Sequence, residues 1–149
     1  VSSTRIRAAL ADADFDSAER LLGRPFVMTG RVQHGQKLGR QLDAPTANIA
    51  LHRIRSPLHG VYAVNVSGGG LSDAPGVANV GVKPTFGESL EATLEVHVLE
   101  GAPDLYGERL TVWFRHKLRD EQKFPSLDAL KGGIATDKAN ARAWLADHG

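Results

Sequence analysis

No cysteine occurs among the 149 residues of the chain. Disulfide frameworks and thiolate metal sites are therefore excluded. The redox compartment is not readable without Cys, and the cytoplasm is the expectation by default alone. No apolar run approaches the ~18 residues that a membrane-spanning helix needs. The start, Val1-Ser2-Ser3-Thr4, is mostly polar and shows neither an initiator Met nor a secretory signal. We therefore expect the chain to be a piece of a longer protein.

The common phosphate-binding motifs are missing as well. The sequence has no G-x-x-x-x-G-K-[ST] P-loop and no G-x-G-x-x-G dinucleotide motif, and it lacks the H-R-D and D-F-G signatures of protein kinases. Its six histidines do not show the i, i+4 spacing of a helical zinc site. A net charge of +1 with interspersed signs gives no electrostatic footprint for nucleic acid. Any phosphate chemistry must therefore use another kind of binding loop.

A change of hydrophobic period divides the chain. Residues 1–24 carry apolar side chains at helical spacing, and Gly23 and Pro25 end this pattern. The period is then two, in short runs at residues 61–66, 93–99 and 110–114. Short strands that are separated by turn-forming clusters, without long helices between them, are typical of an antiparallel sheet closed into a barrel.

The last segment returns to the helical period. Ser126, after Pro125, is placed to cap this helix. The apolar residues near one face are Leu127, Leu130, Ile134, Ala141 and Leu145. Gly132 and Gly133 weaken the helix, since each costs about 1 kcal/mol in a helix interior. The predicted fold class is therefore mainly β, a small antiparallel barrel with a C-terminal helix and a short helical N-terminal segment.

One loop, residues 35–48, combines glycine, positive charge and oxygen donors. Its glycines let the backbone approach a ligand, and its Lys and Arg side chains add positive charge. In an extended chain, Thr46 and Asn48 project to the same side, and two neutral oxygens suit a Mg²⁺ ion that takes its other ligands from phosphates and water. The same residues also fit a glycine-containing hairpin with turn chemistry. The candidate phosphate-binding residues are Gly35, Lys37, Gly39, Arg40 and Pro45.

The run 93–99 presents a carboxylate. Its alternation places Glu95 and His97 together on the face opposite to its apolar residues. A carboxylate on a rigid strand can accept the proton of an attacking hydroxyl, as a general base does, and His97 is the second candidate for that role. The pattern also fits an ordinary Glu on the solvent face of an antiparallel strand.

The charged segment 117–124 follows the last predicted strand. Arg119 offers a fork of hydrogen-bond donors, and Phe124 offers a stacking face. Together the two side chains can flank a planar ligand. A solvated surface loop is the alternative interpretation.

Taken in order, these segments resemble the riboflavin kinase domain over residues 23–145. The strongest marker is Pro45-Thr46-Ala47-Asn48, which follows the loop that contains Gly39-Arg40. Five blocks in register over most of the chain make the resemblance specific. The other four blocks are Asn79-Val80-Gly81-Val82-Lys83-Pro84-Thr85-Phe86, Leu94-Glu95-Val96-His97, Asp104-Leu105-Tyr106-Gly107, and Leu118-Arg119 with Lys123-Phe124.

The resemblance implies a fold and an activity. The family fold is a small antiparallel Greek-key barrel, and the reaction transfers the γ-phosphate of Mg-ATP to the 5′-hydroxyl of riboflavin, giving FMN and ADP. Glu95 would then be the general base, and Thr46 and Asn48 would bind Mg²⁺. The glycine-bearing loop would cover the ATP phosphates, while Arg119 and Phe124 would bind the flavin.

The N-terminal residues 2–7 carry a second resemblance. Ser-Ser-Thr-Arg-Ile-Arg is similar to the closing motif of the FMN adenylyltransferase half of bifunctional bacterial FAD synthetases, although it also fits a capped helix start. We therefore expect residues 1–24 to be a helical linker and the tail of an adenylyltransferase domain, and residues 25–149 to be the riboflavin kinase domain. The linked adenylyltransferase would be its partner, with no nucleic acid or membrane involved, and this chain alone should not make FAD.

One position departs from the family pattern. Asp43-Ala44 stands where the family usually has glycine followed by an apolar residue. A carboxylate beside the phosphates should repel ATP unless it helps to hold the metal. This keeps an alternative open, namely a catalytically weak flavin- or nucleotide-binding module that supports the adenylyltransferase. A structural oligomerisation domain is a second alternative, although it would leave Thr46, Asn48 and Glu95 without a purpose.

Overall fold

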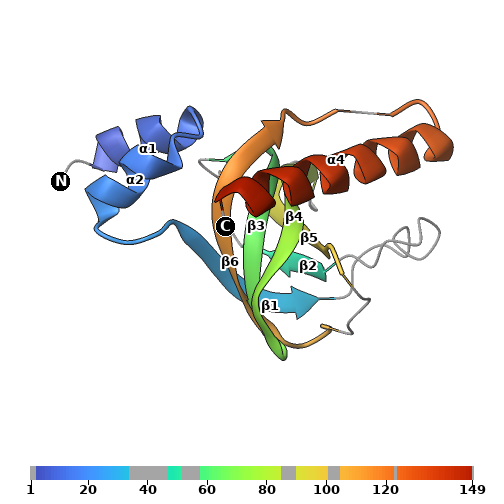
Figure 1. Cartoon of the computed structure of the whole chain (residues 1–149), viewed down its shortest axis with the longest axis horizontal. Coiled ribbons are helices and arrows are strands. Elements are labelled where there is room, and N and C mark those ends of the chain that lie inside the picture. Colours follow the sequence, from blue (N-terminus) through green and yellow to red (C-terminus); the bar gives the residue numbers. More distant parts are fainter. Residues whose placement is uncertain are drawn as a thin grey trace.

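Six antiparallel strands form a closed barrel in the computed structural model (Figure 1). The structure describes residues 3–33, 47–51, 58–84, 90–100, 105–122 and 124–148. The elements are α1 (Ser3–Ala11), α2 (Phe15–Leu22), β1 (Val27–Gln33), β2 (Ala47–Ala50), β3 (Gly60–Gly68), β4 (Leu71–Pro84), β5 (Leu90–Val98), β6 (Arg109–Arg119) and α4 (Leu127–His148). Around the barrel the strand order is β1-β2-β5-β4-β3-β6. The predicted fold class is thus confirmed.

Alternate residues of the strands fill the barrel interior. On β5, Leu94 and Val96 are buried while Glu95 between them is exposed. The same period of two places Val80 of β4 and Val112 of β6 inside. Burying each such side chain stabilises the fold by roughly 1.5–3 kcal/mol. The apolar runs of the sequence therefore become one continuous core.

The N-terminal segment forms two helices instead of the single helical stretch that the spacing predicted. The break falls where Ala13 adopts a positive φ of 55°. Asp14 then caps α2, because its side chain accepts a hydrogen bond from the backbone nitrogen of Ser17 at 3.1 Å. The predicted end is confirmed, since Gly23 is left-handed and its nitrogen donates to the carbonyl of Glu19 at 2.8 Å.

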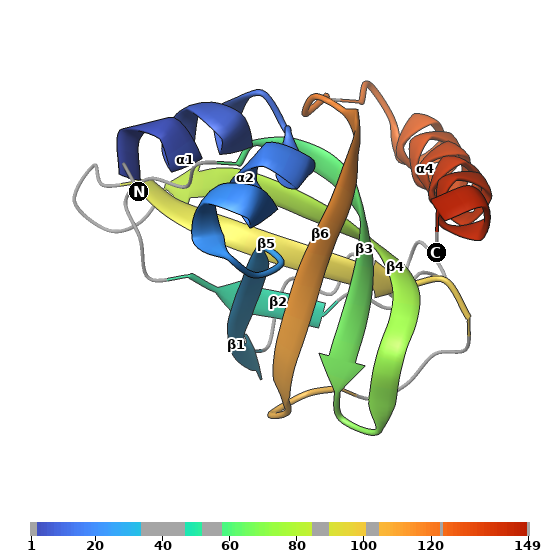
Figure 2. The ribbon, with the colours of Figure 1, turned by 60° about the vertical axis from the view of Figure 1, so that its left-hand side comes forward.

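Aromatic side chains join the N-terminal helices to the barrel. Phe15 of α2 lies 6.3 Å from Phe114 of β6 and 5.9 Å from Tyr62 of β3, measured between ring centroids. Phe26, just before β1, lies 5.9 Å from Phe114. Figure 2 shows α2 beside β6, with α4 on the other side of β3 and β4. The two short helices therefore share the core of the barrel.

The C-terminal helix α4 covers part of the outer face of the barrel, over β3 and β4 (Figure 1). Ser126 caps it as predicted, since its hydroxyl accepts a hydrogen bond from the nitrogen of Ala129 at 3.1 Å. Ala141 and Leu145 of the predicted apolar face are buried against this part of the sheet, but Leu127 is 40% exposed. The buried stripe of the helix instead includes the carboxylate of Asp137.

Candidate active site

The predicted site residues fall into two groups. The first group lies outside the described residues and consists of Gly35, Lys37, Gly39, Arg40, Pro45 and Thr46. Asp43 lies outside them as well. The others lie within them: Asn48, Glu95, Arg119 and Phe124.

The barrel brings Asn48 and Glu95 together. Glu95 of β5 is the register partner of Asn48 on β2 and, on its other side, of Asn79 on β4. Its neighbours Leu94 and Val96 point into the core, so Glu95 faces outward. Directly opposed residues of antiparallel strands have Cβ atoms about 4.5–5.5 Å apart. The carboxylate that the sequence suggested as a base and the amide suggested as a metal ligand are therefore adjacent.

Asn79 is a member of this row that the sequence placed in a family block but not among the candidate site residues. Its Oδ1 atom is buried and has no hydrogen-bond partner among the described residues. A buried acceptor without a donor costs about 1–3 kcal/mol, so it calls for an explanation. The available signal was the alternation of β4, in which Asn79 is a polar residue between the apolar Ala78 and Val80.

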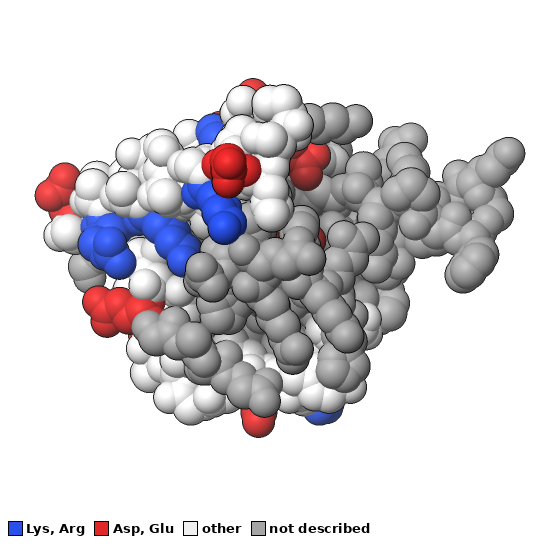
Figure 3. All heavy atoms as spheres, turned by 90° about the vertical axis from the view of Figure 1, so that its right-hand side faces the viewer, with Lys and Arg blue, Asp and Glu red and all other residues white. Residues whose placement is uncertain are grey.

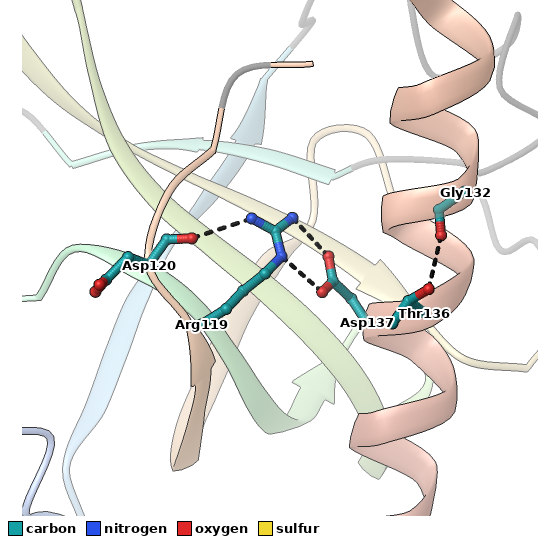
Figure 4. A network of polar contacts seen from close by, with 5 residues as sticks. All are labelled: Arg119, Asp120, Gly132, Thr136 and Asp137. Atoms are coloured by element: carbon teal, nitrogen blue, oxygen red, sulfur yellow. Dashed lines mark hydrogen bonds and ion pairs between the residues drawn. The ribbon is translucent and has the colours of Figure 1, made fainter. Parts of the chain in front are cut away.

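Arg119, at the end of β6, reaches across to α4 (Figure 4). Its Nε and Nη2 atoms donate to the two carboxylate oxygens of Asp137, both at 2.8 Å, and Nη1 donates to the carbonyl of Asp120 at 3.0 Å. The bond to Asp137 raises the pKa of Arg119. Asp137 was missed in the sequence, although an acid on the apolar side of a helix is a signal for a buried ion pair.

Phe124 lies between Arg119 and α4. The guanidinium carbon of Arg119 is 5.5 Å from the centroid of the Phe124 ring. The ring tip occupies a notch at Gly133, where an added Cβ atom would lie 2.7 Å from Cε1 of Phe124. The two predicted flavin-binding residues are thus in contact, and the helix glycine has a packing role.

His97 lies under α4, on the same outer face as Glu95. It is only 8% exposed, and its Nδ1 atom has no hydrogen-bond partner in the described part of the chain. Burial, reinforced by the nearby Lys138 and partly offset by Asp137, lowers the pKa of His97 to about 4. His97 is therefore neutral at pH 7 and covered by the helix, whereas Glu95 is exposed.

Helix α4 carries positively charged side chains, one of which reaches the end of β5. Lys131, Lys138 and Arg142 follow one side of α4 at spacings of seven and four residues. Arg142 donates to the carbonyl of Leu99 at 3.5 Å, and Figure 3 shows Lys and Arg side chains gathered in a row on one face, with acidic side chains around them. Such a row favours the approach of an anion such as a polyphosphate.

The described residues contain no group of three or more His, Cys, Asp or Glu side chains that could hold a metal ion. A cation bound beside Asn48 would take its other ligands from outside this set, as Mg²⁺ usually does when it binds phosphates and water. The amide oxygen of Asn48, next to the carboxylate of Glu95, is a hard donor of the kind that Mg²⁺ prefers. The donor set thus fits this ion.

None of the described helices is both long enough and apolar enough to cross a membrane.

Two bacterial relatives match nearly the whole chain. The bifunctional riboflavin kinase/FMN adenylyltransferase of Pseudomonas fluorescens is 62% identical over 146 residues, which are 98% of this chain and 47% of that protein. The protein of the same name from Escherichia coli (strain K12) is 52% identical over 145 residues, 97% of this chain and 46% of that protein. The chain thus spans about half the length of the curated relatives it matches.

Solved structures agree with the fold. A protein from Streptococcus pneumoniae described as a macrolide-efflux protein has a TM-score of 0.83 and 38% identity, covering 97% of this chain and 47% of that one. Riboflavin kinase from Trypanosoma brucei has a TM-score of 0.57 and 28% identity, covering 81% and 80%. The family described as "Flavokinase: Riboflavin kinase" matches residues 22–145. With a match over most of its length, the chain belongs to the riboflavin kinase family.

Proposed function

We infer that this chain transfers the γ-phosphate of ATP to the 5′-hydroxyl of riboflavin and so forms FMN and ADP. The observation that carries the inference, beyond family membership, is the position of Glu95. It is exposed on the outer face of the barrel, directly between Asn48 on one strand and Asn79 on the other. A base that must meet a substrate hydroxyl needs this combination of access and rigid placement.

Glu95 acts on the nucleophile. Its carboxylate accepts the proton of the 5′-hydroxyl as the hydroxyl oxygen forms a bond to the γ-phosphorus. The bond between that phosphorus and the bridging oxygen of ADP breaks, and its electron pair leaves with ADP. Positioning and charge neutralisation supply most of the catalysis in such transfers. The barrel therefore contributes chiefly by holding Glu95 in a fixed direction.

Mg²⁺ is the cation that we propose for this site. Asn48 would hold it, together with Thr46, which lies outside the described residues. When bound, the ion neutralises charge on the phosphates. Gly35, Lys37, Gly39, Arg40 and Pro45 are proposed to cover the phosphates, as the resemblance implies.

Arg119 and Phe124 are proposed as one wall of the flavin site. Because three hydrogen bonds to Asp137 and to the carbonyl of Asp120 hold the Arg119 guanidinium in place, its contribution is a fixed cationic plane beside the Phe124 ring. An aromatic ring and a guanidinium plane suit the flat isoalloxazine system.

The direct test of the activity is product formation. The chain is incubated with riboflavin, ATP and Mg²⁺, and FMN is measured by chromatography, with EDTA and ATP-free samples as controls. We expect FMN only in the complete mixture. Binding of riboflavin without formation of FMN would overturn the kinase inference in favour of a flavin-binding module.

The metal proposal has its own test. Asn48→Ala should weaken ADP binding, measured by calorimetry, when Mg²⁺ is present and leave it unchanged in EDTA. Asn140→Ala, at an exposed position of α4, is the matched control and should behave as the wild type in both buffers. Equal loss of affinity with and without Mg²⁺ would remove Asn48 from the metal site.

We also propose that residues 1–24 are a linker and the tail of an adenylyltransferase domain, with the kinase domain at residues 25–149. The doubled length of the bifunctional relatives supports this division. A protein that carries both domains should convert FMN to FAD, whereas this chain should stop at FMN. Formation of FAD by the chain alone would contradict the division.

A further inference from the structure

Glu121 lies on the barrel in an unusual position. It belongs to the connection between β6 and α4 and is exposed. A Cβ atom added to Gly81 of β4 would lie 3.0 Å from Cδ of Glu121 and closer still to Oε1. Because real Cβ atoms essentially never approach other atoms so closely, the carboxylate can rest there only because residue 81 is glycine. Gly81 thus provides the seat for this side chain.

Its position over Gly81 places the Glu121 carboxylate near Glu95, the proposed base. Gly81 pairs with Thr93, two residues before Glu95 on β5, and Asn79 of β4 pairs with Glu95 itself. Gly81 and Glu95 are therefore diagonal neighbours, about 7–8 Å apart. Since Val80 points into the core, Gly81 presents the same outer face as Glu95. The carboxylate of Glu121 consequently lies one step from the place where phosphoryl transfer is proposed.

Glu121 also lies between the two ends of the proposed flavin site. Arg119 of β6 is the register partner of Val61 on β3, and Val61 pairs with Asn79 on β4. Three strand spacings of about 4.8 Å separate Arg119 from Glu95 along this row, or roughly 14 Å. If the flavin ring lies against Arg119 while its 5′-hydroxyl meets Glu95, the ribityl chain must cross β4. Glu121 is the carboxylate held over that strand.

The same part of β4 offers acceptors that lack donors. No hydrogen bond or ion pair joins the carboxylate of Glu121 to another described residue, and the buried Oδ1 of Asn79 has no partner among these residues either. The neighbouring cations are engaged, Lys117 by Asp120 at 2.6 Å and Arg119 by Asp137. A ligand that complements this surface must bring donors. The secondary hydroxyls of a polyol chain are such donors, whereas the carbonyl oxygens of the flavin ring are not.

We propose that Glu121, seated on Gly81, determines specificity for the ribityl chain by accepting hydrogen bonds from its secondary hydroxyls. This inference rests on the proposed function, because it takes riboflavin as the substrate. It assigns a role to Gly81, which leaves room for the carboxylate. It also separates recognition of the chain from recognition of the ring by Arg119 and Phe124.

The test compares two flavins that differ in the chain alone. Riboflavin carries the ribityl group, and lumiflavin has a methyl group in its place. Binding of each to the 149-residue chain is measured by quenching of flavin fluorescence, without ATP, for the wild type, Glu121→Ala and Gly81→Ala. Gln122→Ala, at the adjacent exposed position, is the matched control, and circular dichroism confirms that each variant is folded.

Glu121→Ala should weaken riboflavin binding by about tenfold or more, as expected for loss of hydrogen bonds to a charged group, and leave lumiflavin binding unchanged. Gly81→Ala should act in the same direction, because it displaces the carboxylate without removing it, and Gln122→Ala should match the wild type.

An equal loss for both flavins, or no loss for either, would overturn the inference while leaving the kinase function intact. A wild-type chain that binds neither flavin would overturn the proposed function as well, and the FMN assay would show this independently.

Discussion

The two faces of β5 differ sharply in chemistry although they alternate along one strand. The inner face, with Leu94 and Val96, is apolar and almost free of solvent. The outer face carries Glu95, which is exposed, and His97, which is covered by α4. Substitutions on the inner face should therefore act on folding. Substitutions on the outer face should act on chemistry wherever no other element covers the strand.

The helices that pack on the barrel also differ from each other, in the kind of contact that holds them. The N-terminal helices are joined to the barrel by aromatic packing around Phe15 and Phe114. Helix α4 is joined by the ion pair between its Asp137 and Arg119 of β6, and by the Phe124 ring that fits against its Gly133, in addition to apolar contacts. Polar, shape-specific contacts fix the direction of side chains, whereas apolar packing mainly supplies stability. The α4 side is accordingly where we place the flavin.

The largest effect on stability is expected on the inner face. Leu94→Ala leaves a cavity in the barrel and should reduce the free energy of unfolding by about 2–5 kcal/mol. Glu95→Gln, one residue further, keeps the size and shape of an exposed side chain and should reduce it by clearly less than Leu94→Ala does. Urea unfolding monitored by circular dichroism measures both. Equal losses for the two variants would break the distinction between the faces.

His97 should make stability depend on pH. Its pKa is about 4 in the folded chain and near 6.5 when unfolded, so the unfolded chain takes up the proton first as the pH falls. Stability is therefore full above pH ~6.5 and is lost between pH ~6.5 and ~4. At ~1.4 kcal/mol per pH unit the loss amounts to about 3 kcal/mol.

The variant His97→Gln isolates this contribution. Unfolding free energies of the variant and the wild type are measured from pH 7.5 to 4, so that the titration of carboxylates common to both cancels. The wild type should lose about 3 kcal/mol more than the variant over this range. Parallel curves would mean that His97 does not remain neutral beneath α4.

The smallest effect on stability is expected at Gly132 and Gly133 of α4. Because the two glycines are adjacent, Gly132→Ala and Gly133→Ala are well-matched variants. An added Cβ atom at Gly132 meets nothing within 4 Å, so Gly132→Ala should stabilise the chain by up to about 1 kcal/mol. At Gly133 it meets the ring of Phe124. Gly133→Ala should therefore gain less or destabilise, and it should weaken lumiflavin binding. Thermal unfolding and fluorescence titration of the two variants test this, and equal gains with unchanged binding would show that the notch has no role.

Strand β5, which carries Glu95, was predictable because its period of two is clear, whereas β2 and β4 were not among the predicted runs. Residues 93–99 alternate cleanly, and the turn-forming glycines between β3 and β4 mark the hairpin. The separation of α1 from α2 was not predicted, since it depends on the capping bond of Asp14 and the positive φ of Ala13. Propensity alone does not distinguish one interrupted helix from two.

Tertiary partners explain the rest of what the sequence left open. Glu95 could be placed on an outer face, but its position between Asn48 and Asn79 depends on the register of three strands that are distant in sequence. The pairing of Arg119 with Asp137 depends on how α4 crosses the barrel. Gly133 weakened the prediction of a helix, yet the structure shows that it makes room for Phe124. Residue types indicate chemistry, and only the packing shows which residues meet.

The central claim is that the exposed carboxylate on β5 is the base for phosphoryl transfer. Glu95→Gln preserves its shape and removes its ability to accept a proton, so FMN formation at saturating riboflavin and Mg-ATP should fall by about 100-fold or more. Riboflavin affinity should match the wild type, and circular dichroism should show that the variant is folded. Turnover within about threefold of the wild type would contradict the claim and remove Glu95 from the mechanism.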